Sequence, residues 1–234
     1  NVSKSYTDKL LLDHVNLGIQ DKDRIGVLGI NGTGKSTLLK IMAGLEEADE
    51  GIITTGKAVE VVYLPQTPAF NEDISILENI ILGKKAKESY RNIEGEARAM
   101  LAKLGIANCE ELPIHLSGGQ KKRAALVRTL LTPADILVLD EPTNHLDSQM
   151  AEWLEEYLRK YQGALVMVTH DRYFLDKVTN RIVELDKGKL YSYEANYSKF
   201  IEMKALREEM AQATERKNKS LYRVELGWMK RGAK

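Results

Sequence analysis

The chain has 234 residues, which is enough for one domain with a sizeable core and a small additional lobe. Its composition is 43% hydrophobic and 29% charged with a net charge of zero, which is ordinary for a soluble globular protein and gives no overall sign of a nucleic-acid binder. No apolar run approaches the ~20 residues of a membrane span, and the single cysteine, Cys109, excludes an internal disulfide, so we expect a cytoplasmic protein without a membrane span.

The first strong motif along the chain is a glycine-rich loop between a strand and a helix. We expect a buried strand over Arg24–Leu28 and a helix over Lys35–Ala43 that ends at Gly44. Between them, residues 29–36 (GINGTGKS) fit the phosphate-binding pattern G-x4-G-K-[ST] at every fixed position. The backbone amides of such a loop and the N-terminus of its helix bind phosphate, so the sequence predicts a nucleotide site rather than an inert turn.

Two side chains of this loop have defined chemistry. Lys35 can reach the β- and γ-phosphates of a nucleotide, and the Ser36 hydroxyl can ligate Mg²⁺. The loop residues that we expect to contact the nucleotide are Gly29, Asn31, Gly32, Thr33, Gly34, Lys35, Ser36 and Thr37.

Two further residues outside the loop are candidates for the same site. Tyr6, near the start of the chain, could stack on a nucleotide base, although ordinary packing at a sheet edge would also explain it. Gln66 follows a strand expected over Val59–Leu64 and could touch a water on the metal, or could be a plain loop amide.

Residues 70–132 are expected to form a helical lobe inserted between two segments of the sheet. Ser75 to Leu104 is polar, favours helix and contains few strand formers, and Gly105 would cap its last helix. The lobe continues in Leu116-Ser-Gly-Gly-Gln120, which opens a helix to Leu131 with Ser117 as its N-cap. The free amides of this helix start predict a second anion site, and two such sites in one domain suggest a nucleotide shared across an interface.

Acidic and imidazole side chains follow two of the later strands. Ile136–Leu139 is a buried strand that leads into Asp140, placed to hold Mg²⁺, and Glu141, placed to activate a water that attacks the γ-phosphate. A solvated strand end is the alternative. His170 follows the strand Ala164–Thr169 and could contact the γ-phosphate or be structural.

The order of elements indicates an α/β fold with a mainly parallel sheet. After the strand Arg181–Leu185, a turn over Asp186–Lys189 leads to a last strand, Leu190–Tyr193. Ser198 to Met229 contains no proline and reads as one long, largely solvated helix. Residues 214–234 contain seven Lys or Arg and two Glu, so this segment carries five excess positive charges and residues 1–213 carry five excess negative charges. This asymmetry hints at a polyanionic partner, but it also fits a solvated helix face.

Taken in this order, these motifs resemble the nucleotide-binding domain of ATP-binding cassette (ABC) proteins, from residue 1 to about 193. The resemblance implies an ABC-type P-loop NTPase fold for residues 1–195, with a mainly parallel core, a small antiparallel β piece and the helical lobe. It implies ATP and Mg²⁺ as cofactors, with Ser36, Gln66 and Asp140 at the metal, and Tyr6 stacked on adenine. Glu141 would be the catalytic base, His170 the switch histidine and Lys35 a catalytic cation. The signature residues that would contact ATP bound on an opposite domain are Ser117, Gly118, Gly119 and Gln120.

Three features resemble the ABC-F family rather than transporter subunits. They are Pro142-Thr-Asn-His-Leu-Asp147, the run from His170 to Asp176, and Asn196-Tyr-Ser198 before the long charged helix. ABC-F proteins are soluble, carry two ABC domains in one chain, and mostly act on ribosomes. Residues 196–234 would then begin the linker between the two domains, which reaches toward tRNA, and residues 227–232 resemble the Uup-like branch. The expected partners are a second ABC domain, in the same full-length chain or in a homodimer, and ribosomal RNA or tRNA.

The sequence departs from the full ABC-F pattern in three places. Two functions other than a ribosomal ATPase also stay open. Only one ABC domain is present, Asn1–Tyr6 looks like the inside of a first strand, and the stretch from Gln66 to Ser117 is short for an extra arm in the lobe. The alternatives are the ATPase subunit of an ABC transporter and a DNA-maintenance ATPase, since phosphate contacts do not distinguish RNA from DNA.

Overall fold

The computed structural model describes residues 1–6, 9–82 and 92–232, with side chains as far as Lys219. Its centre is a six-stranded sheet in the order β4-β5-β6-β3-β7-β8, in which β8 pairs antiparallel with β7 and the other neighbours are parallel. The strands are β3 (Arg24–Leu28), β4 (Val61–Leu64), β5 (Ile136–Asp140), β6 (Ala164–Val168), β7 (Arg181–Asp186) and β8 (Lys189–Tyr193). The predicted α/β fold with a mainly parallel sheet is therefore confirmed.

Alternating side chains divide the core into two layers on opposite faces of the sheet. Along β5, Leu137 and Leu139 join one buried cluster while Val138 joins the other, as the two-residue period of a strand requires. The helix α1 (Lys35–Met42) covers the Val138 face. The other face is covered by α5 (Ser148–Lys160) and α6 (Arg172–Val178). The close approach of α6 depends on Gly26 of β3, where an added Cβ would lie 2.8 Å from the Leu175 side chain.

A two-stranded antiparallel piece, β1 (Val2–Tyr6) and β2 (Lys9–Val15), lies beside this core. The resemblance to ABC proteins implied a small antiparallel piece, but strand β2 was not predicted from the sequence. Its buried residues Leu11 and Leu12 are adjacent, because the pairing with β1 contains register shifts. The strand therefore lacks the alternation by which a half-buried strand is recognised, and the Asp13 amide ties it to the Gly188 carbonyl at 2.8 Å.

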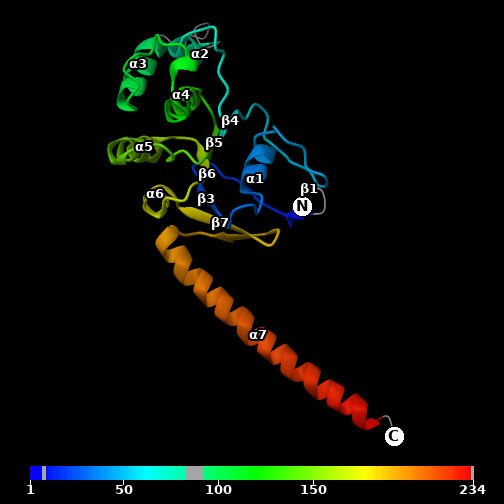
Figure 1. Cartoon of the computed structure of the whole chain (residues 1–234). Helices are drawn as coiled ribbons and strands as arrows, with labels where there is room; N and C mark the ends of the chain where they lie inside the picture. The colour runs from blue at the N-terminus through cyan, green and yellow to red at the C-terminus, as the bar shows by residue number, and fades with distance from the viewer. Residues whose placement is uncertain (7–8, 83–91, 233–234) are drawn as a thin grey trace.

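The lobe consists of α2 (Ile76–Ile81), α3 (Ile93–Lys103) and α4 (Gly118–Leu130), which lie together above the sheet in Figure 1. Residues 83–91 of the predicted lobe lie outside the described part. Capping boxes start two of its helices, at Ser75 with Glu78 and at Ser117 with Gln120, so the predicted N-cap at Ser117 is confirmed. Gly105 has φ 71°, and the amides of Gly105 and Ile106 close the end of α3, as predicted.

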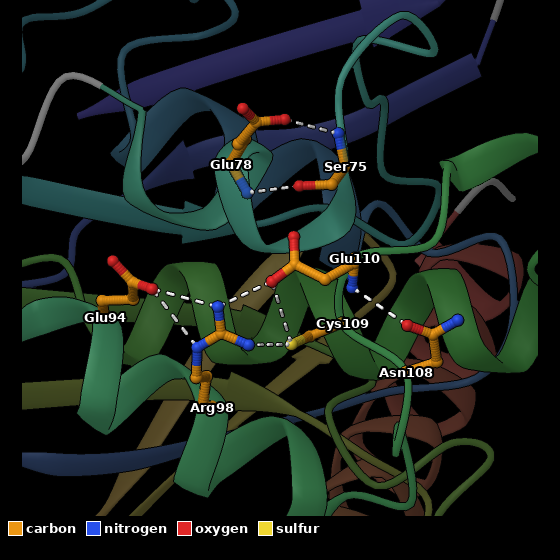
Figure 2. A network of polar contacts seen from close by, with 7 residues as sticks. All are labelled: Ser75, Glu78, Glu94, Arg98, Asn108, Cys109 and Glu110. Atoms are coloured by element: carbon orange, nitrogen blue, oxygen red, sulfur yellow. Dashed lines mark hydrogen bonds and ion pairs between the residues drawn. The ribbon is translucent and has the colours of Figure 1, made fainter.

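A polar network on the lobe joins α3 to the segment after it (Figure 2). Arg98 donates to Glu94 at 3.0 Å, to Glu110 at 2.6 Å and to the sulfur of Cys109 at 2.9 Å. Cys109 itself is buried and packs in the apolar core of the lobe. The network therefore fixes the connection that leads from α3 toward the start of α4.

The predicted bounds of most elements are correct to within a few residues, and the differences have local causes. The strand expected from Val59 begins at Val61, because the Glu60 amide donates to the Asp135 carboxylate instead of to a neighbouring strand. The last helix, α7 (Tyr197–Gly232), is longer at both ends than predicted. None of the described helices combines the length and apolar character needed to span a lipid bilayer.

The long helix α7 leaves the domain as a single rod (Figure 1), but its first turns are anchored to β7 and β8. Glu184 of β7 has a side chain only 6% exposed and pairs with Lys204 at 2.5 Å and with Arg207 at 3.0 Å. The Arg207 guanidinium also lies 3.9 Å from the centre of the Tyr191 ring. A buried carboxylate held by two cations of α7 therefore fixes the direction in which the helix leaves the sheet.

We expect that replacing both Lys204 and Arg207 by Met lowers the free energy of unfolding by about 2 kcal/mol, because Glu184 would keep a buried charge with neither cation beside it. This is below the usual cost for a fully buried pair, since both cations are partly exposed. Urea unfolding measures the change, and Lys199→Met, an exposed position on the same helix, is the control. Equal unfolding midpoints for the double variant and the control would show that the ion pairs do not anchor α7.

Candidate nucleotide site

An open cavity of about 430 Å³ lies where β3, β5 and β6 end. In open α/β sheets, ligands gather at this carboxyl edge. The predicted site residues that line it are Tyr6, Asn31, Gly32, Gly34, Lys35, Ser36, Thr37, Gln66, Asp140, Glu141 and His170. One cavity thus collects side chains from separate segments of the chain.

The glycine-rich loop has a backbone that favours glycine at several positions. Gly32 and Gly34 have φ values of 76° and 102°, in the left-handed region that a Cβ disfavours. At Gly34 a Cβ would also lie 3.0 Å from the Cβ of Leu11, and at Gly29 it would lie 2.6 Å from the Leu185 carbonyl oxygen. The loop therefore stays close to the sheet and leaves its amides available at the start of α1.

Lys35 crosses the inside of this loop. Its side-chain nitrogen donates to the carbonyl of Gly29 at 2.8 Å and to that of Ile30 at 3.1 Å, and the residue is only 9% exposed. Burial lowers the pKa of this ammonium, while the nearby carboxylates of Glu141 and Asp140 oppose that shift. Lys35 is therefore a largely desolvated cation beside the cavity, where its charge acts strongly.

Two predicted loop residues take structural places, and one supporting residue was missed. Gly29 and Thr33 do not line the cavity, and the Thr33 hydroxyl donates to the Ile30 carbonyl at 2.9 Å inside the loop. Lys9 of β2 donates to the Gly32 carbonyl at 2.7 Å and supports the loop from outside. No sequence signal marks Lys9, because the strand that carries it was not recognised.

Asp140 and Glu141 lie at the end of β5 in different environments. Asp140 is 3% exposed, and its carboxylate accepts a hydrogen bond from the Tyr63 hydroxyl at 3.3 Å. Burial, together with Asp140, raises the pKa of Tyr63 well above its ordinary value, so this hydroxyl remains a donor. Glu141 has φ 54°, an unusual value for a residue with a side chain, and its amide donates to the Val168 carbonyl at 2.8 Å. Such backbone strain persists where the surrounding structure holds it and is often found at active sites.

The Glu141 carboxylate faces His170. The side chain of Glu141 is 8% exposed, and its Oε1 lies 3.4 Å from Nε2 of His170, which is itself 66% exposed. Burial raises the pKa of the Glu141 carboxyl, and the charge and main-chain amide of His170 partly oppose this. A carboxylate with a raised pKa is a stronger base, as expected of a group that removes a proton from water.

The oxygen donors at the cavity suit a hard divalent cation. Ser36, Gln66 and Asp140 all line it and supply a hydroxyl, an amide and a carboxylate. Among the described residues, no group of three or more His, Cys, Asp or Glu is placed to hold a metal alone. The donor set fits Mg²⁺, which usually takes few protein ligands and completes its shell with water and substrate phosphates.

The signature residues Ser117, Gly118, Gly119 and Gln120 do not line the cavity, and the resemblance implied that they contact a nucleotide bound on an opposite domain. Gln120 completes the capping box, since its side chain accepts from the Ser117 amide at 2.9 Å. Ser117 and Gly118 are exposed, and apart from the flanking residues and the backbone of α4 no described atom lies within 4 Å of a Cβ built on Gly118. The start of α4 is therefore an open helix N-terminus outside the cavity of its own chain.

The turn after Glu141 contributes more to the site than the sequence predicted. Asn144, noted only as a family feature, lines the cavity, and His145 has φ 68°. The hydroxyls of Thr143 and Thr169 lie 2.6 Å apart and tie this turn to the loop that carries His170. Their position directly after two strand ends is the signal that could have found them.

Comparisons with known proteins agree with this geometry. A family model described as ABC transporter matches residues 12–144, and a second with the same description matches residues 183–234. An uncharacterized ABC transporter ATP-binding protein of Bacillus subtilis, YfmR, is 44% identical over 100% of this chain and 43% of its own length. The energy-dependent translational throttle protein EttA of Mycobacterium tuberculosis is 37% identical over 100% of this chain and 48% of its own length. The ATP-binding protein Uup of Buchnera aphidicola is 41% identical over 87% of this chain and 35% of its own length.

A solved structure supports the same assignment. The dimeric ATP-binding cassette MJ0796, in a post-hydrolysis state with ADP and Pi, has a TM-score of 0.71 at 27% identity, covering 83% of this chain and 96% of that one. The chain spans about half or less of the length of the curated relatives named above. The chain belongs to the ATP-binding cassette family as an ABC ATPase domain, and with EttA and Uup among its relatives the predicted ABC-F membership is confirmed.

Proposed function

We propose that this chain is one ATP-hydrolysing domain of a cytoplasmic ABC-F protein that acts on the ribosome in translation. Residues 1–195 would be the ABC domain, with its helical lobe at about 70–132, and residues 196–234 would begin the linker to a second ABC domain. The observation that carries the ATPase part is the single cavity that collects Lys35, Asp140, Glu141 and His170.

In this proposal, hydrolysis is an in-line attack of water on the γ-phosphate. Glu141 orients the water and accepts its proton, and His170, whose ring faces Glu141 at 3.4 Å, contacts the γ-phosphate. Lys35 stabilises the charge that develops on the phosphate oxygens. When bound by Ser36, Gln66 and Asp140, Mg²⁺ would neutralise charge on the β- and γ-phosphates. Tyr6, which is 47% exposed at the rim of the cavity, stacks on adenine.

The proposed partner is a second ABC domain, in the same full-length chain or in a second copy. Ser117 and Gly118 are exposed and lie outside this chain's own cavity, where the Ser117 hydroxyl and the Gly118 amide would meet a nucleotide bound by another domain. The related structure named above is described as dimeric. A single domain would therefore hydrolyse ATP poorly, because each complete site takes residues from both partners.

The ribosomal part of the proposal depends on α7 and on one relative. The end of α7 carries the basic excess of residues 214–234, which suits the phosphates of RNA. EttA is named as a translational throttle. A long helix fixed to the ATPase core by Glu184 would carry these basic residues away from the domain toward such a partner.

The test is ATP-dependent binding to ribosomes. We expect the full-length protein carrying Glu141→Gln, with the matching change in its second domain, to sediment through sucrose with ribosomes only when ATP is present, at near-physiological salt. Replacing Arg216, Lys217 and Lys219 of α7 by Gln should weaken this binding and its salt dependence.

A matched control tests whether the effect comes from the basic residues of the linker or from any loss of positive charge. Lys57, Lys103 and Lys160 lie on the body of the domain, and replacing these three by Gln should leave sedimentation unchanged. If the protein binds ATP but does not associate with ribosomes, the ribosome is excluded as its partner. Binding to DNA or to a co-encoded membrane subunit would then support the DNA-maintenance or transporter alternative.

A further inference from the structure

A second, much smaller cavity lies beside the nucleotide cavity, between the end of β5 and α4. Its volume is about 10 Å³, which is roughly the space of one water molecule. Gln66, Asp140, Glu141 and Asn144 line both cavities. Lys122, Arg123 and Leu126 of α4 line only the small one. Glu141 is therefore placed between the nucleotide cavity and the helix that begins at the signature residues.

Two residues that line this small cavity each have a buried side-chain atom without a hydrogen bond among the residues that the structure describes. These atoms are Nε of Arg123, a donor, and Oε2 of Glu141, an acceptor. Three such side-chain atoms occur in the described part of the chain, and two of them belong to residues that line this one cavity. An unpaired buried donor or acceptor is costly, so a complementary pair beside a cavity of this size points to a molecule that joins them.

The position of Arg123 is fixed independently of Glu141. Its Nη1 donates to the His145 carbonyl at 3.0 Å, and His145 in turn lies against Gly119 at the start of α4. This bond ties the signature helix to the turn that follows Glu141, and it leaves Nε as a buried donor with no partner in the described part of the chain. A guanidinium held in this way cannot easily turn to find another acceptor.

We propose that one ordered water accepts a hydrogen bond from Nε of Arg123 and donates one to Oε2 of Glu141. Arg123 is then a positioning residue for the proposed hydrolysis, on which this inference rests: it holds the carboxylate of Glu141 through the water and does not touch the nucleotide. Because the signature residue Ser117 caps α4, a shift of this helix would move Arg123, the water and the carboxylate together. The lobe and the proposed catalytic base are thereby linked by one short chain of hydrogen bonds.

The first test is direct and independent of activity. A crystal structure of the protein at a resolution that shows buried waters should reveal one water at about 2.7–3.2 Å from both atoms. A direct contact between Arg123 and Glu141, or an Arg123 side chain that has left the cavity, would overturn the proposal. Since this readout needs no hydrolysis, it remains informative even if the wild-type protein proves not to be an ATPase.

The second test uses steady-state ATP hydrolysis by the full-length protein. Arg123→Met should lower kcat roughly tenfold or more, with ATP affinity within about twofold of the wild type, because a hydrogen bond to a charged group is lost at the carboxylate and not at the nucleotide. Arg123→Lys keeps the positive charge but loses Nε, so it should not restore kcat. Lys122→Met removes a cation at the same cavity and is the matched control, with kcat near the wild-type value.

A double-variant cycle separates positioning from a general loss of structure. In the Glu141→Gln background, Arg123→Met should cause little further loss of the residual hydrolysis, since the two changes remove one coupled function. Independent, multiplying losses, or an Arg123→Lys variant with full activity, would contradict the water bridge. Unfolding midpoints of each variant, measured in parallel, show whether the chain still folds.

Discussion

Replacing Glu141 by Gln should lower ATP hydrolysis by roughly 10²–10⁴-fold, the usual contribution of a general base. The amide has nearly the same size, so it should fit the strained position at φ 54° and keep the surrounding contacts. It cannot accept a proton from water, whereas the native carboxyl, with a pKa raised by burial and only 8% of its side chain exposed, can do so. Single-turnover and steady-state phosphate release measure the loss.

Binding of ATP should survive this substitution. Glu141 would act on the water and not on the nucleotide, and removal of a negative charge beside the phosphates should slightly strengthen binding. The matched control is Asp171→Asn, the same chemical change next to His170. Asp171 caps α6, where Asn serves almost as well, and it does not line the cavity. Unchanged turnover by Glu141→Gln would remove Glu141 from the role of base.

The parts of the site that could be predicted from sequence are those in which the functional residues are adjacent in the chain. The loop from Gly29 to Ser36 and the pair Asp140-Glu141 each combine a buried strand with polar residues directly after it. The sheet then brings these segments together, because parallel strands end at a common edge. The fold class followed from the same alternation of strands and helices.

The parts that could not be predicted depend on contacts between elements, which the sequence does not display. Glu184 lies within an apolar strand, and its burial is explained only by Lys204 and Arg207 on the first turns of α7. Arg123 is one of four basic residues on α4. Only the fold shows that, among the described residues of this helix, it alone bonds to the His145 carbonyl. Strand β2 was missed because its irregular pairing buries two successive leucines. For Glu184 and Arg123 the deciding partner lies on another element, whereas for β2 the cause is its irregular pairing with the neighbouring strand β1.

Replacing Lys35 by Met should weaken ATP binding by on the order of tenfold to a hundredfold, since a buried cation contributes one strong charged hydrogen bond to the phosphates. Met has a similar length and shape, so the loop should keep its packing while losing the charge. The carbonyls of Gly29 and Ile30, which Lys35 now contacts at 2.8 and 3.1 Å, would then face an apolar side chain. Titration with a fluorescent ATP analogue measures the affinity.

The control for this prediction is Lys9→Met. Lys9 also donates to a carbonyl of the same loop, that of Gly32 at 2.7 Å, but it does not line the cavity. If Lys35 acts through its charge at the phosphates, Lys9→Met should change affinity by only a few fold, as the loss of an outer support would. Equal losses for the two variants would mean that Lys35 serves mainly to hold the loop in shape, and the phosphates would then have to be bound by backbone amides alone.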